Sequence, residues 1–182
     1  MRWRLNFWDD RLREPRIENA QSMTFTVRRA SVDDAAQIAL CLAELGYRTP
    51  SPVVADRLRQ FATSATDAVF VAVGNPETPV AGVISVHLLP LFHTSGYLAR
   101  ITSLVVLTRV QRHGIGLALV KAAEAFAWEH ACQRIEVTSG DHRPDAHAFY
   151  QRIGYALDER RFIKRAAESR VASRPTNGEV AG

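Results

Sequence analysis

The chain has 182 residues, of which 47% are hydrophobic and 23% are charged, a composition typical of one globular domain with a buried core. No apolar run reaches the roughly 18 residues that a membrane-spanning helix needs, so we expect no membrane partner. The formal net charge is +4, but the arginines are scattered along the sequence instead of forming a basic stripe. This distribution argues against nucleic acid as a partner.

The cysteines and histidines of the chain indicate whether disulfides or a metal site are expected. Cys41 and Cys132 are too few for a disulfide framework, and we expect both to be buried free thiols. The six histidines follow no metal-ligand spacing, so no metal is expected.

Three segments differ in composition. Residues 1–22 lack the apolar region and the cleavage site of a secretory signal, and we interpret them as an N-terminal extension of a cytoplasmic protein. Residues 23–165 carry the periodic apolar pattern of a folded domain. Residues 166–182 are small and polar, and we expect them to form a disordered tail.

Apolar periodicity and turn residues predict the elements of the domain in chain order. The expected strands and helices alternate as β-α-α-β-β-β-α-β-α-β. They cover a strand at 24–28, helices at 31–46 and after 51–52, a hairpin of 69–73 and 80–89, a strand at 98–107, a helix at 114–130, a strand at 134–138, a helix at 144–154 and a strand at 155–165. This order predicts an α/β protein, of the α+β kind, with a mixed, mostly antiparallel central sheet flanked by helices.

The sharpest chemical signal lies between a predicted strand and a predicted helix. It reads Gln111-Arg112-His113-Gly114-Ile115-Gly116. Glycines in such a turn allow a ligand to approach the backbone closely, and the free N–H groups at a helix start bind anions. The pattern lacks the Lys-Ser/Thr of a P-loop and the third glycine of a dinucleotide fold, so it favours another kind of diphosphate site.

Residues 101–120 resemble the acetyl-CoA-binding motif Q/R-x-x-G-x-G/A of the GNAT superfamily of N-acetyltransferases. Gln111, Gly114 and Gly116 occupy its three defining positions. The resemblance implies the GNAT fold and acetyl-CoA as cosubstrate, with the loop holding the pyrophosphate and the preceding strand pairing with the pantetheine arm. The implied acetyl-CoA-binding residues are Leu104, Val105, Val106, Gln111, Arg112, His113, Gly114, Ile115, Gly116 and Tyr150.

A second segment resembles the other hallmark of that family, A-x-x-F-Y-x-x-x-G-F/Y. Ala146, Phe149, Tyr150, Gly154 and Tyr155 match it. The resemblance implies that Tyr150 lies near the cofactor sulfur and protonates the departing thiolate, a role that suits a phenol.

The general base is the point at which the sequence departs from the family. Many members carry a carboxylate on the fourth strand, where this chain has Thr102 and Ser103. A hydroxyl is a poor base without an activating partner, but it could order a water that relays the proton. His87 and His93 are further candidates, because imidazole titrates near neutral pH. We expect these two histidines to bind the substrate together with Tyr47, and Glu44 to line the same pocket.

The sequence therefore predicts an acetyl-CoA-dependent N-acetyltransferase in which a primary amine attacks the thioester directly. A small-molecule acceptor is expected, and a loose similarity to aminoalkylphosphonate acetyltransferases makes phosphonate amines a lead. Two alternatives stay open: a non-catalytic acyl-CoA-binding or regulatory module, and a protein N-acetyltransferase. A homodimer that uses the aromatic N-terminal extension is a further expectation.

Overall fold

In the part of the chain that the structure describes, five strands form one sheet in which spatial neighbours follow the chain order. They are β1 (Thr26–Arg29), β2 (Asp67–Val73), β3 (Gly82–Pro90), β4 (Tyr97–Val106) and β5 (Cys132–Val137). The first four pair antiparallel, whereas β5 pairs parallel with β4. A parallel neighbour requires a crossover connection, and helix α3 (Ile115–Glu129) supplies it.

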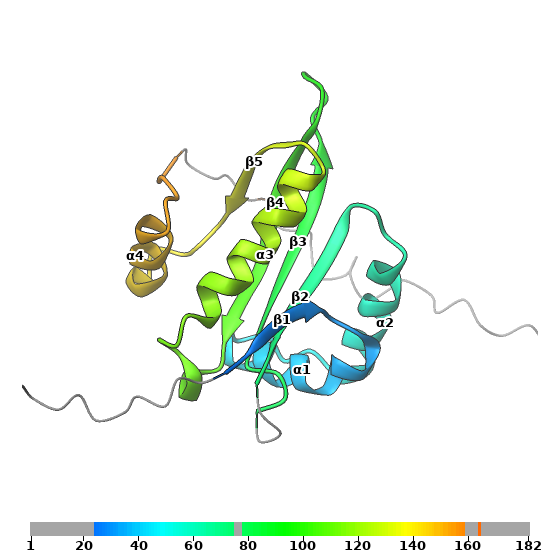
Figure 1. Cartoon of the computed structure of the whole chain (residues 1–182), viewed down its shortest axis with the longest axis vertical. Coiled ribbons are helices and arrows are strands. Elements are labelled where there is room, and N and C mark those ends of the chain that lie inside the picture. Colours follow the sequence, from blue (N-terminus) through cyan, green and yellow to red (C-terminus); the bar gives the residue numbers. More distant parts are fainter. Residues whose placement is uncertain (1–23, 75–77, 159–163, 165–182) are drawn as a thin grey trace, which may run out of the picture. The chain divides into compact units, whose positions relative to one another are not determined.

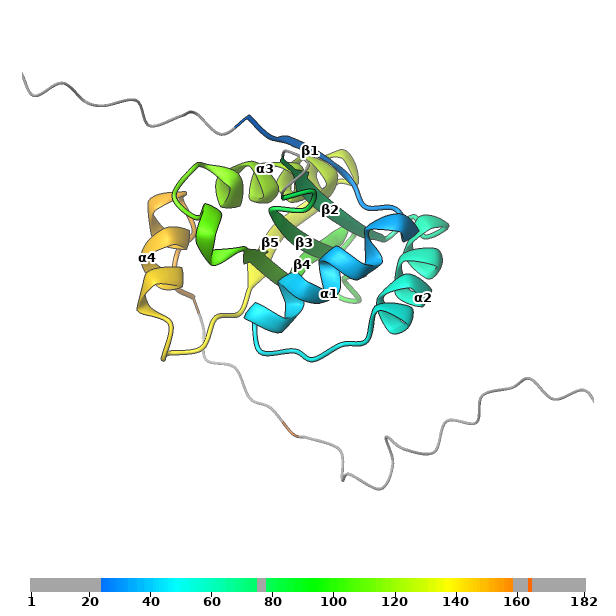
Figure 2. The same cartoon turned by 90° about the horizontal axis from the view of Figure 1, so that it is seen from below.

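Helices cover both faces of the sheet, as Figures 1 and 2 show. Helix α3 packs on β2, β3, β4 and β5, while α1 (Ala35–Glu44) packs on β3 and β4 and α2 (Ser51–Ala62) packs on β2. Apolar side chains from both layers fill the core, and Ile84, Val86, Leu119 and Val120 are fully buried there. Gly82 is required beside α3, because an added Cβ would lie 2.7 Å from the Val105 carbonyl oxygen.

The start of α1 is fixed by charge and capping. A short 3-10 turn, η1 (Val32–Asp34), precedes the helix. The backbone N–H of Ser31 donates to Asp34 Oδ2 over 2.8 Å, and Arg28 donates to both Asp34 oxygens over 2.7 and 2.8 Å. The buried Asp34 carboxylate is therefore fully satisfied, which holds the turn between β1 and α1 in place.

The computed structural model describes residues 24–74, 78–158 and 164. These residues fall into two compact units, one ending at Thr138 and the other beginning at Ser139. The first unit holds the sheet and the helices α1 to α3, and the second holds α4 (Pro144–Arg152). Among the helices of these residues, none combines the length and hydrophobicity that a bilayer crossing requires.

The predicted fold class is confirmed, and the element order agrees up to α4. Cys41 and Cys132 are buried free thiols, as expected. The exception is the closing strand at 155–165. Residues 155–158 form no strand, and the rest of that segment lies almost entirely outside the described residues, as do the predicted extension 1–22 and tail 166–182.

Candidate active site

One edge of β4 is left open beyond the point where β5 stops. The register pairs β5 with β4 only from Tyr97 to Ile101, although β4 continues to Val106. On its other side β4 remains paired with β3 up to Val106. Within the described chain, no strand covers residues 102–106 on the β5 side, so N–H and C=O groups there are available to an extended ligand.

The open edge leads directly into the predicted anion-binding loop. After β4, the chain makes a 3-10 turn, η2 (Thr108–Val110), and then enters residues 111–116. Glu44 at the end of α1 holds this turn, because its Oε2 accepts hydrogen bonds from Thr108 N–H over 2.8 Å and from Thr108 Oγ1 over 3.0 Å. The expectation that Glu44 also lines the acceptor pocket stays a prediction.

The backbone of the loop is shaped by two left-handed residues. Gly114 has φ 81° and caps α3, and Arg112 has φ 66°. Around Gly114 an added Cβ would meet nothing within 4 Å, so the space beside its backbone is open. In the described residues the N–H groups of residues 112–116 find no backbone acceptor. The helix start therefore presents a cluster of free donors, which is the electrostatic requirement for a diphosphate.

The side chains of the loop turn back onto its own backbone. Gln111 Nε2 donates to the Val106 carbonyl over 3.1 Å, which ties the loop to the end of β4. His113 Nδ1 lies 2.8 Å from the Gln111 carbonyl oxygen, and Ile115 is buried in the core. These three side chains tie the loop to β4, to its own backbone and to the core.

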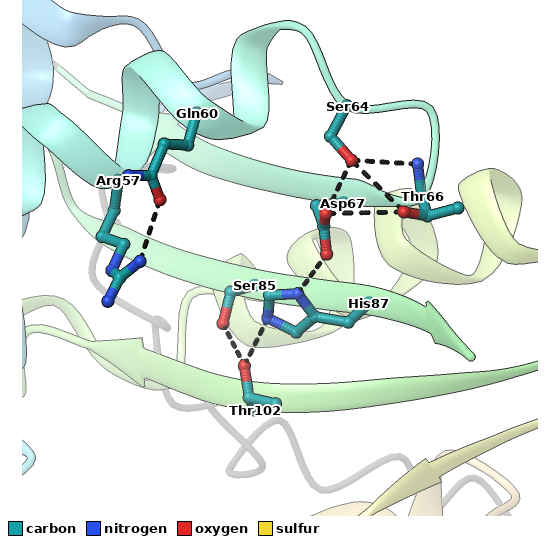
Figure 3. Close-up of polar contacts among 8 residues, drawn as sticks. All are labelled: Arg57, Gln60, Ser64, Thr66, Asp67, Ser85, His87 and Thr102. Atoms are coloured by element: carbon teal, nitrogen blue, oxygen red, sulfur yellow. Dashed lines mark hydrogen bonds and ion pairs between the residues drawn. The ribbon is translucent and has the colours of Figure 1, made fainter.

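A chain of hydrogen bonds links three strands on the face of the sheet that α2 covers (Figure 3). His87 Nδ1 lies 2.6 Å from Asp67 Oδ1, and His87 Nε2 lies 2.8 Å from Thr102 Oγ1. Thr102 Oγ1 in turn lies 2.8 Å from Ser85 Oγ. We call Asp67, His87, Thr102 and Ser85 the polar relay. It brings together two predicted residues, His87 and Thr102, that lie 15 positions apart in the sequence.

A β-bulge places Thr102 in this chain. Ser85 pairs with Ser103 and Val86 pairs with Ile101, so Thr102 is the extra residue on β4 and opposes no residue of β3. A bulge re-aims a side chain, and such irregularities are frequent beside active sites. The Thr102 hydroxyl is exposed while His87 and Asp67 are half-buried, so the relay runs from the surface inward.

The Asp67 carboxylate is held ionised by its neighbours. Burial pushes the other way, but hydrogen bonds from Ser64, over 2.6 Å, and from His87 keep the pKa of Asp67 below its ordinary value. The ring of Phe61 from α2 stands edge-on to the His87 imidazole, with 5.4 Å between centroids. His87 is therefore fixed by Asp67 at one nitrogen and by Phe61 across its ring.

Other predicted residues lie apart from the relay. Ser103 is half-buried on β4 without a side-chain bond to the relay, and His93 is exposed in the turn between β3 and β4. Tyr47 is 58% exposed in the loop after α1. Their predicted part in substrate binding stays a prediction.

Tyr150 lies on α4, in the second unit. Its ring packs against Phe149 and Tyr155, with centroids 5.2 and 5.6 Å away. Burial raises the pKa of Tyr150 to about 12, partly offset by the Arg143 charge. The phenol therefore keeps its proton at neutral pH, which a general acid requires.

Sequence reasoning missed Asp67. The predicted strand began at residue 69 and left this aspartate outside it, although β2 begins at Asp67. The predicted hairpin could have identified this residue, because its register places Asp67 directly opposite His87.

The profile of the acetyltransferase (GNAT) family matches residues 34–155. The chain belongs to the GNAT family. The match spans both predicted motifs, so the resemblance drawn from the sequence is confirmed. GNAT proteins are acetyltransferases that use acetyl-CoA, and the expected class of enzyme and its cosubstrate are confirmed at the level of the family.

A curated relative and two solved structures support the assignment. The aminoalkylphosphonate N-acetyltransferase of Salmonella typhimurium is 35% identical over 85 residues, which cover 47% of this chain and 55% of that protein. The match therefore spans about half the length of the relative. A structure described as a transcriptional regulator from Bacillus halodurans has a TM-score of 0.70 and 24% identity, covering 79% of this chain and 100% of that one.

An aminoglycoside N-acetyltransferase solved in complex with CoA has a TM-score of 0.69 and 13% identity, with 79% of this chain and 95% of that chain covered. At these identities the two structures establish the GNAT fold.

Proposed function

We propose that this protein transfers the acetyl group of acetyl-CoA to the primary amine of a small molecule. One observation carries the proposal: among the described residues, the edge of β4 at residues 102–106 has no partner strand on the β5 side, and one short turn connects it to the free N–H groups of residues 112–116. Acetyl-CoA has matching chemistry, since its pantetheine arm contains amides and its diphosphate is anionic. The donor set of this chain therefore fits that molecule.

The residues of the chain would have distinct tasks. Leu104, Val105 and Val106 would align the pantetheine arm along β4, and a strand N–H would polarise the thioester carbonyl. Holding the amine and the thioester together makes direct attack effectively intramolecular, so positioning supplies much of the rate. Tyr150 would donate its proton to the departing thiolate, since its phenol is protonated at neutral pH.

The acceptor is proposed to be a small amine, with aminoalkylphosphonates as the first compounds to test. Support comes from the 35% identical relative, whose name includes that substrate class. Because the match spans 55% of that relative, the amine panel should also contain polyamines, amino sugars and amino acids.

A second function is favoured by one observation, the hydroxyl residues Thr102 and Ser103 at the β4 positions where the family resemblance implies a carboxylate. A GNAT domain without a base would bind acyl-CoA and act as a sensor. Tight binding of acetyl-CoA without turnover of any amine in the panel would identify such a sensor. Acetylation of a protein N-terminus is tested by adding peptides to the same panel.

Two measurements test the proposed function. Calorimetric titration of the full chain with acetyl-CoA measures binding, and thiol release with each amine measures turnover. The proposal predicts saturable binding and thiol release that depends on an amine. Absence of binding would contradict the assignment of residues 104–116, and binding without amine-dependent release would favour the sensor.

We also propose that the protein works in the cytoplasm, without nucleic acid, and as a homodimer. The dimer contact expected in residues 1–22 lies outside the described residues. Light scattering of the full chain and of a chain that begins at residue 23 tests this contact, because the proposal predicts a dimer only for the full chain.

A further inference from the structure

The polar relay ends at the same residue where the open edge of β4 begins. Thr102 lies next to Ile101, the last residue of β4 that pairs with β5. Its exposed hydroxyl is also the outer member of the relay through His87 to Asp67. A second molecule that lies next to a ligand bound along the open edge would therefore be close to the Thr102 hydroxyl. This hydroxyl is already connected to an imidazole and a carboxylate.

The hydrogen positions in the relay follow from the ionised aspartate. A carboxylate only accepts hydrogen bonds, so the proton between Asp67 and His87 belongs to Nδ1, which donates to Oδ1. In that tautomer Nε2 carries no proton and accepts, so the Thr102 hydroxyl donates to it. The lone pairs of Thr102 Oγ1 are left for Ser85, which donates over 2.8 Å, and for one further donor from solvent or a ligand.

The proposed reaction requires a group that accepts a proton from the acceptor amine. A primary amine is protonated at neutral pH and cannot attack a thioester until it loses a proton. In this chain β4 offers hydroxyls at residues 102 and 103, and a hydroxyl needs an activating partner to accept a proton. The relay supplies that partner at Thr102 and does not reach Ser103.

We propose that Thr102 and His87 remove the proton from the acceptor amine, with Asp67 holding His87 in the required tautomer. This inference rests on the proposed function and adds the general base to it. The ammonium proton moves to Thr102 Oγ1 as the threonine proton moves to His87 Nε2. The products are a neutral amine, an intact hydroxyl and an imidazolium paired with the Asp67 carboxylate. The imidazolium returns its proton to solvent before the next turnover.

The charged groups around His87 favour this direction of transfer. Asp67 on β2 stabilises the imidazolium directly. Arg100 on β4 lies opposite His87 in the register, but its charge is paired with Glu136 over 2.6 Å. From α2, the ring of Phe61 covers the imidazole, while Arg57 binds Gln60 over 2.8 Å. The unmatched charge in contact with His87 is therefore the carboxylate.

The test compares variants that keep or remove each link of the relay. Thr102→Val removes the hydroxyl at nearly constant shape, Thr102→Ser keeps it, and His87→Gln removes the proton acceptor. The matched control is Thr26→Val, which makes the same exchange at an exposed position on β1. Turnover is measured with a basic amine and with a weakly basic amine that is already neutral at the assay pH. Acetyl-CoA affinity is measured by calorimetry for each variant.

The relay predicts a specific pattern. With the basic amine, Thr102→Val and His87→Gln should lose about 100-fold or more in kcat, as expected for removal of general base catalysis. Thr102→Ser should recover most of the kcat that Thr102→Val loses, because it restores the hydroxyl, and the control Thr26→Val should stay close to the unaltered protein. With the weakly basic amine, or as pH rises through the pKa of the basic amine, the deficit should shrink, because the amine is then already neutral and needs no deprotonation before it attacks. Acetyl-CoA affinity should be unchanged in all variants.

Asp67→Asn tests the positioning role. It should lower kcat with the basic amine and alter the pH–rate profile, while a purely structural role would lower the rates for both amines equally. Equal rates for Thr102→Val and the unaltered protein, or a deficit that is the same for both amines, would overturn the relay while leaving acetyl transfer intact. If the unaltered protein turned over no amine, the proposed function and the relay would both be rejected.

Discussion

Gly114 offers the most direct perturbation of the proposed acetyl-CoA site. Its φ of 81° lies in the left-handed region, where alanine costs about 1–2 kcal/mol more than glycine. Because an added Cβ would meet nothing within 4 Å, Gly114→Ala should lose only this backbone term in the free protein. For a domain of this size, each kcal/mol lowers Tm by about 2–4 °C.

The effect on binding should exceed the effect on folding. The new methyl group would stand where a diphosphate approaches the free N–H groups of the loop. A hydrogen bond to a charged group contributes about 1.5–3 kcal/mol, so loss of one should weaken acetyl-CoA binding by about tenfold or more. Calorimetric titration measures the affinity, and thermal unfolding measures the cost in stability.

Gly46 provides a matched control. It also has a left-handed backbone, with φ 97°, and an added Cβ would meet nothing within 4 Å. Gly46→Ala should therefore lower Tm to a similar extent while keeping acetyl-CoA affinity. If Gly114→Ala behaved in the same way as this control, the loop would not be the diphosphate site.

Three further predictions concern side chains. Tyr150→Phe should lower turnover strongly at unchanged acetyl-CoA affinity, because the phenol is the proposed proton donor; unchanged turnover would remove that role. Hydrogen bonds, first from Arg28, hold the pKa of Asp34 below its ordinary value. The stability this carboxylate contributes should be complete above about pH 4 and be lost as pH falls through the lower folded value. Asp34→Asn should cost about 1–3 kcal/mol at pH 7 and flatten that acid dependence, measured by denaturant unfolding. Burial raises the pKa of Cys41 to about 11, so a thiol reagent should label it slowly unless the protein is unfolded. Rapid labelling of the native protein would contradict this burial.

The sequence predicted those parts of the fold that depend on local periodicity. Apolar spacing located each strand and helix up to α4 to within a few residues, because the same side chains fill the core on both faces of the sheet. The closing strand was inferred from alternation in residues 155–165, yet residues 155–158 form no strand. Alternation alone does not supply a neighbouring strand with which to pair.

The candidate site also has parts that could be predicted from the sequence and parts that could not. The loop at 111–116 was predictable because its glycines and its position before a helix are encoded within six residues. The contact between His87 and Thr102 depends on a bulge, and nothing in the alternation of Ile101, Thr102 and Ser103 marks it. Asp67 joins them through the cross-strand register, a property of two strands that one local pattern cannot show.

The proposed reaction moves an acetyl group from acetyl-CoA to an amine. The most direct measurement incubates the full chain with acetyl-CoA and the amine panel, then quantifies free thiol and acetylated amine in the same sample by mass spectrometry. Acetyl transfer to the amine predicts equal amounts of free thiol and acetylated amine, with thiol release falling to background when the amine is omitted. Thiol release without acetylated amine, or no release with any amine, would contradict it.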